Sequence, residues 1–340
     1  MPFISARVPD DFDGDLRVDK FIASLPDGMN RSKLKSGVTE ILVNGKKARL
    51  SQKVRPGDQI DIQWEDNIPD DIAPENIPLE IIYEDDNVTV VNKAQGMVTH
   101  PACGNWSGTL VNALLYHWGR EAVRAVRDGS ESEILLSRRP GIVHRLDKET
   151  SGIIIAAKNR ESEEYLQNQF RLRRVQKEYI CVCIGRPKKR TGNICTQIIR
   201  DPKNRQRFKA CADTDEGKFA RTIYHCIACY GNYSLMRVRI KTGRTHQIRV
   251  HMKYIGCPVL GDPLYAPKDT LFPGATLMLH SVQMKIRLPD SDCQTRRENQ
   301  ADYPALKSSS GCSVFRTATP ARFLEVLRAL QRKYPRTIIT

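Results

Sequence analysis

Residues 141–152 read Gly-Ile-Val-His-Arg-Leu-Asp-Lys-Glu-Thr-Ser-Gly and lead directly into the apolar run 153–157. Such a dense group of polar side chains is often only a solvated turn, because charged residues normally lie outside. The pattern also fits a loop that carries catalytic groups, in which the glycines permit unusual backbone angles and Arg145 forms a charge pair with Asp147. Composition alone leaves both interpretations open.

The segments around this loop predict an α+β domain. Short apolar runs bounded by turn residues indicate strands, and apolar residues at helical spacing indicate helices. We expect strands at 79–83, 88–91, 153–157, 179–184, 220–226, 233–240 and 278–288, and helices at 109–118, 162–170 and 246–255. This set fits a mostly antiparallel β-sheet with flanking helices.

A second concentrated stretch, residues 241–252, reads Lys-Thr-Gly-Arg-Thr-His-Gln-Ile-Arg-Val-His-Met. It follows a strand and enters a helix, and backbone N–H groups at such a turn can bind a phosphate or a carboxylate. His246 and His251 do not predict a metal site, because zinc-binding helices space their histidines four apart with a glutamate between them. Cys226 and Cys229 form a lone C-x-x-C without the second pair that zinc needs, so we predict no metal.

Residues 15–66 form a smaller unit of their own. Helices are expected at 18–25 and 31–38, Asn44-Gly45 predicts a tight hairpin, and 59–64 alternates like a strand. The proline-containing segment 67–78 predicts a linker to a larger domain at 79–340. Within that domain the polar segment 290–313 predicts a surface loop, and Thr319-Pro320 predicts the start of the last helix.

The charge balance favours a polyanionic partner. The chain has 54 Lys and Arg against 39 Asp and Glu, a net charge of +15, and nucleic acid is the leading candidate for such an excess. A basic surface without a partner, or one attracted to anionic lipid, is the alternative. No apolar run approaches the ~20 residues of a membrane span, and the acidic N-terminus does not resemble a secretory signal, which predicts a cytoplasmic protein.

Several ordered blocks together resemble the RluA family of pseudouridine synthases. The family signature HRLD-x-x-TSG is present at 144–152, and further blocks agree at 83–101, 177–179, 241–252 and 261–263. The resemblance implies that Asp147, Tyr179 and Arg249 are the catalytic residues. Burial in an RNA-covered pocket would disfavour the ionised form of Asp147, and the guanidinium of Arg249 can oppose that effect. It also implies RNA contacts for His144 and Arg244 and for Arg145, which would fill the space left by a flipped base; a structural charge pair is the other reading of Arg145.

The N-terminal unit resembles the alpha-L RNA-binding domain of the ribosomal protein S-four type. In that family the second helix and the hairpin face RNA. The resemblance therefore implies phosphate contacts for five basic side chains: Arg31, Lys33, Lys35, Lys46 and Lys47.

The two resemblances imply an enzyme that converts uridine to pseudouridine in structured RNA. Large-subunit ribosomal RNA is the expected substrate, transfer RNA is the alternative, and we expect a monomer that needs no cofactor. An RNA-binding protein without activity would have no reason to keep Asp147, Tyr179 and Arg249 together. A glycosidic hydrolase would use paired carboxylates, for which Asp147 and Glu149 are the only close pair in this block, and it would release the base.

Overall fold

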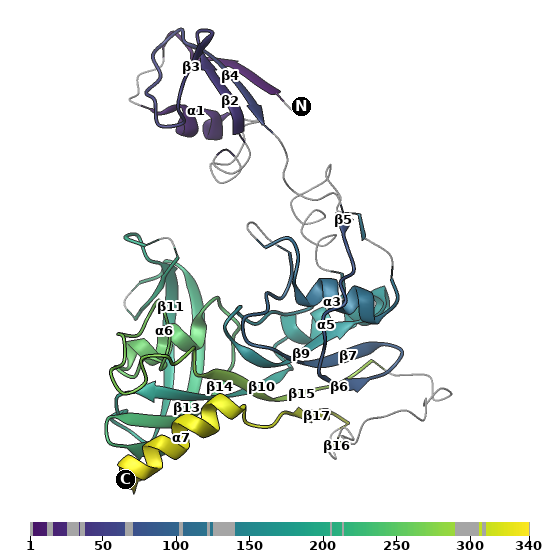
Figure 1. Ribbon diagram of the computed structural model, residues 1–340, viewed down its shortest axis with the longest axis vertical. Coiled ribbons are helices and arrows are strands. Elements are labelled where there is room, and N and C mark those ends of the chain that lie inside the picture. The colour runs from purple at the N-terminus through teal and green to yellow at the C-terminus, as the bar shows by residue number, and fades with distance from the viewer. Residues whose placement is uncertain are drawn as a thin grey trace. The chain divides into compact units, whose positions relative to one another are not determined.

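The computed structural model describes two compact units, Met1–Asp70 and Asp71–Thr340 (Figure 1). The described residues are 3–11, 16–25, 34, 38–64, 71–101, 105–120, 123–124, 140–204, 206–212, 214–289, 306–307 and 311–339. Within them, no helix is long and apolar enough to cross a lipid bilayer.

The first unit is a four-stranded antiparallel sheet with one described helix. Its strands lie in the order β1-β4-β2-β3, with bounds β1 Phe3–Arg7, β2 Val38–Val43, β3 Lys46–Lys47 and β4 Gln59–Trp64, and the helix is α1, Val18–Ser24. Val18 and Ile22 of α1 pack on Ile60 and Ile62 of β4 in a small core. The unit therefore buries its own apolar face.

The predicted hairpin is confirmed at the turn between β2 and β3. Asn44 and Gly45 have φ angles of 52° and 73°, as a two-residue hairpin turn requires. Of the second expected helix, only Leu34 and Val38 are described, and Val38 already begins β2. Arg31, Lys33 and Lys35 lie outside the described residues.

The second unit is built on one large sheet. Its main path runs β12-β11-β13-β14-β10-β15-β9-β7-β6, with bounds β6 Ile81–Glu84, β7 Val88–Lys93, β9 Ser151–Ala157, β10 Gln176–Ile184, β11 Thr191–Arg200, β12 Phe208–Cys211, β13 Lys218–Tyr230, β14 Tyr233–Ile240 and β15 Leu279–Ile286. Neighbouring strands on this path are antiparallel except β15 and β9. The predicted α+β fold with a mostly antiparallel sheet is confirmed.

Helices cover both faces of this sheet. Four are described: α3 Leu110–His117, α5 Arg160–Arg171, α6 Gln247–Tyr254 and α7 Ala321–Lys333. Strand β9 is buried throughout; Ile154 packs in a cluster with Leu114 of α3, and Ile153 in another with Leu166 of α5. Because successive residues of a strand point to opposite faces, these helices cover different faces of β9. Figure 1 shows α7 crossing the sheet beside β13 and β14, with α6 on the other side.

The two halves of the sheet meet at a very short pairing. In β15, His280 and Ser281 pair in parallel with Ser151 and Gly152 of β9. Gly152 has a φ of 114°, and a Cβ added to it would meet the Ser281 backbone, only 2.6 Å from its nitrogen. The close approach of the two strands therefore requires glycine at the end of the polar loop.

The end of α5 holds an arginine in an unusual backbone conformation. Arg174 N–H donates to the Gln169 carbonyl and Arg173 N–H to the Phe170 carbonyl, the two hydrogen bonds of a Schellman motif. Arg173 has a φ of 55° at the position where this motif usually has glycine. A left-handed conformation costs a residue with a side chain roughly 1–2 kcal/mol.

Three parts of this unit differ from the sequence expectations. The supposed linker 67–78 belongs to the second unit from Asp71 onward, because β5, Asp71–Ile72, pairs with β8, Val123–Arg124, and Ile72 is buried. The segment 290–313 is not a loop throughout, since β16, Leu306–Lys307, pairs with β17, Ser313–Arg316. Pro320 is the N-cap of α7 rather than its first helical residue. The rest of 290–310 lies outside the described residues.

We expect Gly152→Ala to destabilise the protein strongly. The new Cβ would overlap the Ser281 backbone and the residue would be held at an unfavourable φ, so the free energy of unfolding should fall by about 3 kcal/mol or more. Gly274→Ala is the matched control, because nothing lies within 4 Å of its added Cβ. Chemical denaturation of both variants measures the difference, and equal stability would contradict the close packing of β9 on β15.

Candidate active site

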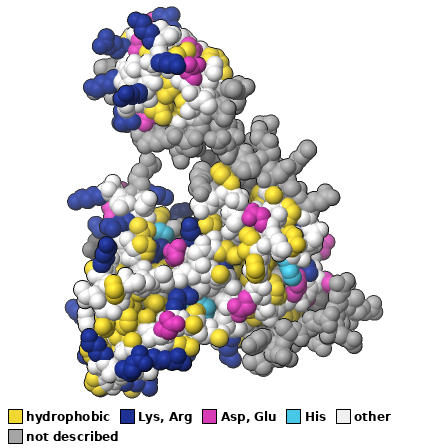
Figure 2. All heavy atoms as spheres, in the orientation of Figure 1, with side chains coloured by type: hydrophobic (Ala, Val, Ile, Leu, Met, Phe, Trp, Pro, Cys, Tyr) yellow, Lys and Arg dark blue, Asp and Glu magenta, His cyan; other side chains and the backbone are white. Residues whose placement is uncertain are grey.

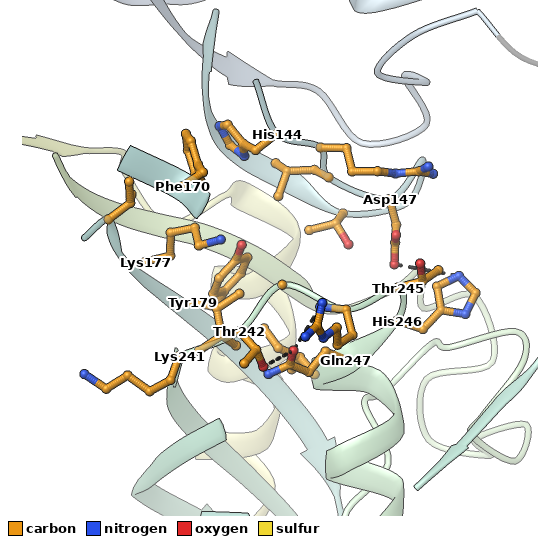
Figure 3. A pocket seen from close by; sticks show the side chains of 18 of the residues that line it. His144, Asp147, Phe170, Lys177, Tyr179, Lys241, Thr242, Thr245, His246 and Gln247 are labelled. Carbon is orange, nitrogen blue, oxygen red and sulfur yellow. Dashed lines mark hydrogen bonds and ion pairs between the residues drawn. The ribbon is translucent and has the colours of Figure 1, made fainter. Parts of the chain in front are cut away.

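A pocket of about 480 Å³ opens beside the polar loop, in the size range of small-ligand sites, roughly 300–1,000 Å³ (Figure 3). Its walls come from the loop before β9, the end of α5, the start of β10, the turn after β14 and the first turn of α6. Figure 2 shows the surface hollowed in the second unit. Asp147 is the only carboxylate among the lining residues, which include seven Lys and Arg side chains.

The Asp147 carboxylate lies close to the side chains of Arg249 and His246. Its Oδ2 lies 3.4 Å from Arg249 Nη1 and 3.9 Å from His246 Nε2. The Asp147 side chain keeps a fifth of its surface exposed, so a ligand in the pocket can reach it. The arrangement presents one carboxylate that is held by a cation and remains accessible.

Arg249 is fixed by a second carboxylate. Its Nε and Nη2 each donate to one oxygen of Asp262 at 2.7 Å, and both side chains are buried. Burial alone would lower the pKa of Arg249, but the paired Asp262 carboxylate outweighs it and raises that pKa. Asp262 also accepts the backbone N–H groups of Leu264 and Tyr265. Arg249 is therefore a permanent cation with one free edge toward Asp147.

His246 lies on the other side of Asp147 and contacts Tyr265. The hydroxyl oxygen of Tyr265 accepts the Phe208 N–H at 2.8 Å and lies 2.9 Å from His246 Nδ1. When the Tyr265 O–H donates to Nδ1, Nε2 carries the proton and faces Asp147. Burial lowers the pKa of His246, although the Asp147 charge opposes this effect. Burial therefore favours the neutral form of the imidazole.

Tyr179 forms the floor of the pocket. It lies on β10 with only 5% of its surface exposed, and Figure 3 shows its ring between Lys177 and Asp147. Burial, helped by the Asp147 charge, raises the pKa of the Tyr179 hydroxyl well above its usual range. The hydroxyl therefore stays protonated at neutral pH.

A network of hydrogen bonds lies behind the polar loop. Ser151 Oγ accepts from Arg322 Nη2 at 2.6 Å and lies 2.9 Å from His280 Nδ1, while His280 Nε2 lies 2.7 Å from Thr317 Oγ1. Arg322 belongs to α7, so the C-terminal part of the chain holds the residues that directly follow the loop. Burial, helped by the Arg322 charge, lowers the pKa of His280 to about 4.

The structure brings six of the predicted site residues to one pocket. Asp147, Tyr179, Arg249, His144, Arg145 and Arg244 all line it. The expected charge pair between Arg145 and Asp147 is absent from the described contacts, since Asp147 pairs with Arg249 instead. Lys46 and Lys47 are exposed on the first unit, whose placement relative to the pocket is not described. The functional roles stay predictions.

Sequence reasoning missed three residues that shape the site. Asp262 and Tyr265 hold Arg249 and His246, and Lys177 lines the pocket two residues before Tyr179. Asp262 was visible in the block 261–263, and Lys177 stood in the block with Tyr179. Tyr265 and the Ser151 network gave no signal, because their partners lie far away in the sequence.

Comparison with known proteins identifies the family. A model of the family described as RNA pseudouridylate synthase matches residues 87–254. A Borreliella burgdorferi protein named ribosomal large subunit pseudouridine synthase D is 41% identical over 277 residues, which are 80% of this chain and 82% of that protein. The chain belongs to the RluA-type family of RNA pseudouridine synthases. A protein of the same name from Zymomonas mobilis is 39% identical over 73% of this chain and 76% of its own length.

The fold of this pseudouridine synthase is also found among solved structures. Human RNA pseudouridylate synthase domain containing 4 superposes with a TM-score of 0.52 over 77% of this chain and 95% of its own, at 20% identity. At that identity the likeness concerns the fold alone. The family places the chain among enzymes that isomerise uridine to pseudouridine, and its substrate is RNA.

The stability of the synthase should fall as the pH is lowered from 7 to 5. His251 and His280 are fully buried, and burial lowers the pKa of each from 6.5 to about 4. Below pH 6.5 the unfolded chain therefore binds protons that the folded chain does not. At roughly 1.4 kcal/mol per pKa unit, each histidine should cost on the order of 3 kcal/mol by pH 4.

Chemical denaturation across this pH range measures the slope, and a His251→Gln, His280→Gln double variant should flatten it. A wild-type free energy of unfolding that stays constant between pH 7 and 5 would contradict the buried neutral state of these histidines.

Proposed function

We propose that this pseudouridine synthase modifies large-subunit ribosomal RNA and that Asp147 is its essential catalytic carboxylate. The position of Asp147 supports its catalytic role. It is the only carboxylate among the described residues that line the pocket, and it lies 3.4 Å from the guanidinium of Arg249. The names of the Borreliella and Zymomonas relatives support the choice of RNA. We expect the reaction to occur in the cytoplasm.

The isomerisation breaks the bond between the ribose anomeric carbon and N1 of the base and forms a bond from the same carbon to C5. The carboxylate of Asp147 either attacks the anomeric carbon or removes a proton from the neighbouring ribose carbon, and both routes need it ionised. Arg249 favours the ionised form, because an opposite charge within about 4–6 Å stabilises it. N1 gains a proton and C5 loses one, so no co-reactant is consumed.

Tyr179 supports the detached base. Its buried ring provides a flat aromatic surface for uracil, and base–aromatic stacking contributes roughly 1–3 kcal/mol. The uridine must first leave its stack, at a cost of a few kcal/mol. Arg145 is exposed and lines the pocket, so its side chain can occupy the vacated space in the RNA.

We expect Asp147→Asn to reduce turnover by about 10³-fold or more while RNA affinity changes only a few-fold. The substitution removes the ionised oxygen but no phosphate contact, and Arg249 keeps its pair with Asp262. Pseudouridine formation is measured by the release of tritium from RNA labelled at uridine C5, because C5 loses its hydrogen in the reaction. Mass spectrometry of the same RNA separates isomerisation, which leaves the mass of unlabelled RNA unchanged, from base loss, which does not. Substantial pseudouridine formation by a folded Asp147→Asn variant would refute the assignment.

Tyr179 variants serve as a comparison in the same assay. Tyr179→Phe keeps the stacking surface and should retain more activity than Tyr179→Ala. Equal losses in the two variants would show that the hydroxyl is the important part of the residue. Mapping of modified positions in ribosomal and transfer RNA transcripts tests the choice of RNA.

We also propose that the first unit is an alpha-L-type domain that anchors RNA. Lys46 and Lys47 are exposed beside the tight turn of the β2–β3 hairpin, where two adjacent cations can contact neighbouring phosphates. Arg31, Lys33 and Lys35, which the resemblance adds, lie outside the described residues.

A Lys46→Ala, Lys47→Ala double variant should therefore show a shallower dependence of log affinity on log salt, by roughly one to two units. Lys188→Ala, Lys189→Ala is the matched control, because it removes the same charge from two adjacent exposed lysines of the second unit. RNA binding across a salt series decides the matter. Equal slopes for the two double variants would argue against a specific RNA anchor at the hairpin.

A further inference from the structure

The end of the pocket away from Asp147 carries three cations that the catalytic proposal does not use. Arg171 is the last residue of α5, Arg173 lies just after that helix, and Lys177 is the second residue of β10. We call these three residues the α5-end cluster. All three line the pocket. In Figure 3, Lys177 lies with Phe170 and His144 on one side of Tyr179, and Asp147 and His246 lie on the other.

The α5-end cluster has no anionic partner in the described part of the chain. Among those residues no carboxylate forms an ion pair with Arg171, Arg173 or Lys177, and Arg171 Nη2 donates only to the side-chain oxygen of Asn168. Lys177 Nζ lies 5.3 Å from the centre of the Phe170 ring, a contact that does not neutralise its charge. Asp147 is already paired with Arg249.

Arg173 has a left-handed backbone conformation that is energetically unfavourable for a residue with a side chain. The Schellman motif at the end of α5 needs a left-handed residue there, and glycine would adopt that conformation without strain. Non-glycine residues in strained conformations cluster at sites where the side chain has a function. An arginine in the last turn also interacts well with the helix dipole, and this is the structural alternative.

Lys177 distinguishes a functional role for the cations from stabilisation of the helix dipole, because it belongs to β10 and not to the helix. Burial lowers the pKa of Lys177 to about 8, so its ammonium group is partly withdrawn from water without a counter-charge. A helix dipole gives no reason for a cation at that place. A bound anion would compensate the charge of the partly buried lysine and would account for an arginine in a strained conformation.

We propose that the α5-end cluster is a subsite for an RNA backbone phosphate next to the target uridine. The proposal rests on the proposed function, in which the ribose of that uridine lies at Asp147. Lys177 and Tyr179 are two apart on β10, so their side chains lie on the same face of the strand. A base stacked on Tyr179 therefore has the ammonium group of Lys177 beside it, within reach of a phosphate of the same strand.

Arg173→Gly tests the subsite, because it removes the cation and relieves the backbone strain at once. The melting temperature should stay the same or rise by roughly 2 °C. Affinity for unmodified ribosomal RNA transcript should fall about ten-fold, and the dependence of log affinity on log salt should become shallower by about 0.7–0.9. The loss should appear mainly in KM, with kcat changed much less.

Two further variants control this experiment. Arg173→Lys keeps the charge and the strain and should keep the salt dependence of the wild type. Arg174→Ala removes a neighbouring exposed arginine that does not line the pocket, and it should leave both affinity and salt dependence unchanged.

A lowered melting temperature with unchanged RNA affinity in Arg173→Gly would overturn the proposal and assign Arg173 a purely structural role. An equal loss of affinity in Arg174→Ala would also overturn it, because the binding would then belong to a general basic surface. Failure of the proposed function is recognised separately, by an Asp147→Asn variant that still makes pseudouridine. In that case the affinity results for Arg173 would still stand as evidence on phosphate binding alone.

Discussion

The site depends on the short parallel pairing between β15 and β9. The two antiparallel halves of the sheet meet there through Ser151 and Gly152, immediately after the loop that carries Asp147. Gly152 lets the strands approach until no side chain fits between them, and Arg322 and His280 hold Ser151 from the far face. The loop is therefore fixed at its C-terminal end by contacts that reach from the end of the chain, while its other face stays open to the pocket.

Once the loop is fixed, the chemistry depends on how one guanidinium is shared. Arg249 donates from Nε and Nη2 to the buried carboxylate of Asp262, and its Nη1 points toward Asp147. A cation already neutralised by one carboxylate can be buried at moderate cost, since buried charges persist only when paired. Arg249 can then hold Asp147 in place and ionised without sealing it from the substrate. This differs from an ordinary surface salt bridge, in which both partners are free to move in water.

Several other residues of the pocket are in conformations or environments that reduce the stability of the fold. His246 and Arg173 adopt left-handed backbone angles without being glycine, and Lys177 is a partly buried cation without a carboxylate partner among the described residues. Elsewhere in the second unit, α3 and α5 begin at satisfied caps, Thr109 and Asn159, and β9 is buried throughout. Local conflicts that collect at one place, while the scaffold is consistent, mark that place as functional.

The sequence by itself determined the fold class, most strands near the pocket and the blocks that carry Asp147, Tyr179 and Arg249, because apolar periodicity and short motifs are local properties of the chain. It did not reveal β11 and β12, whose polar strands depend on neighbours for their pairing. It suggested two cations for Asp147, Arg145 from the adjacent sequence and Arg249 from the family resemblance. The tertiary structure decided between them: the described partner is Arg249, 102 positions away, and not Arg145. Only the tertiary structure showed that Asp262 holds Arg249 and that α7 supports the loop from behind. Such contacts join residues whose separation in the chain carries no periodic signal, so they exist only once the sheet has closed around the pocket.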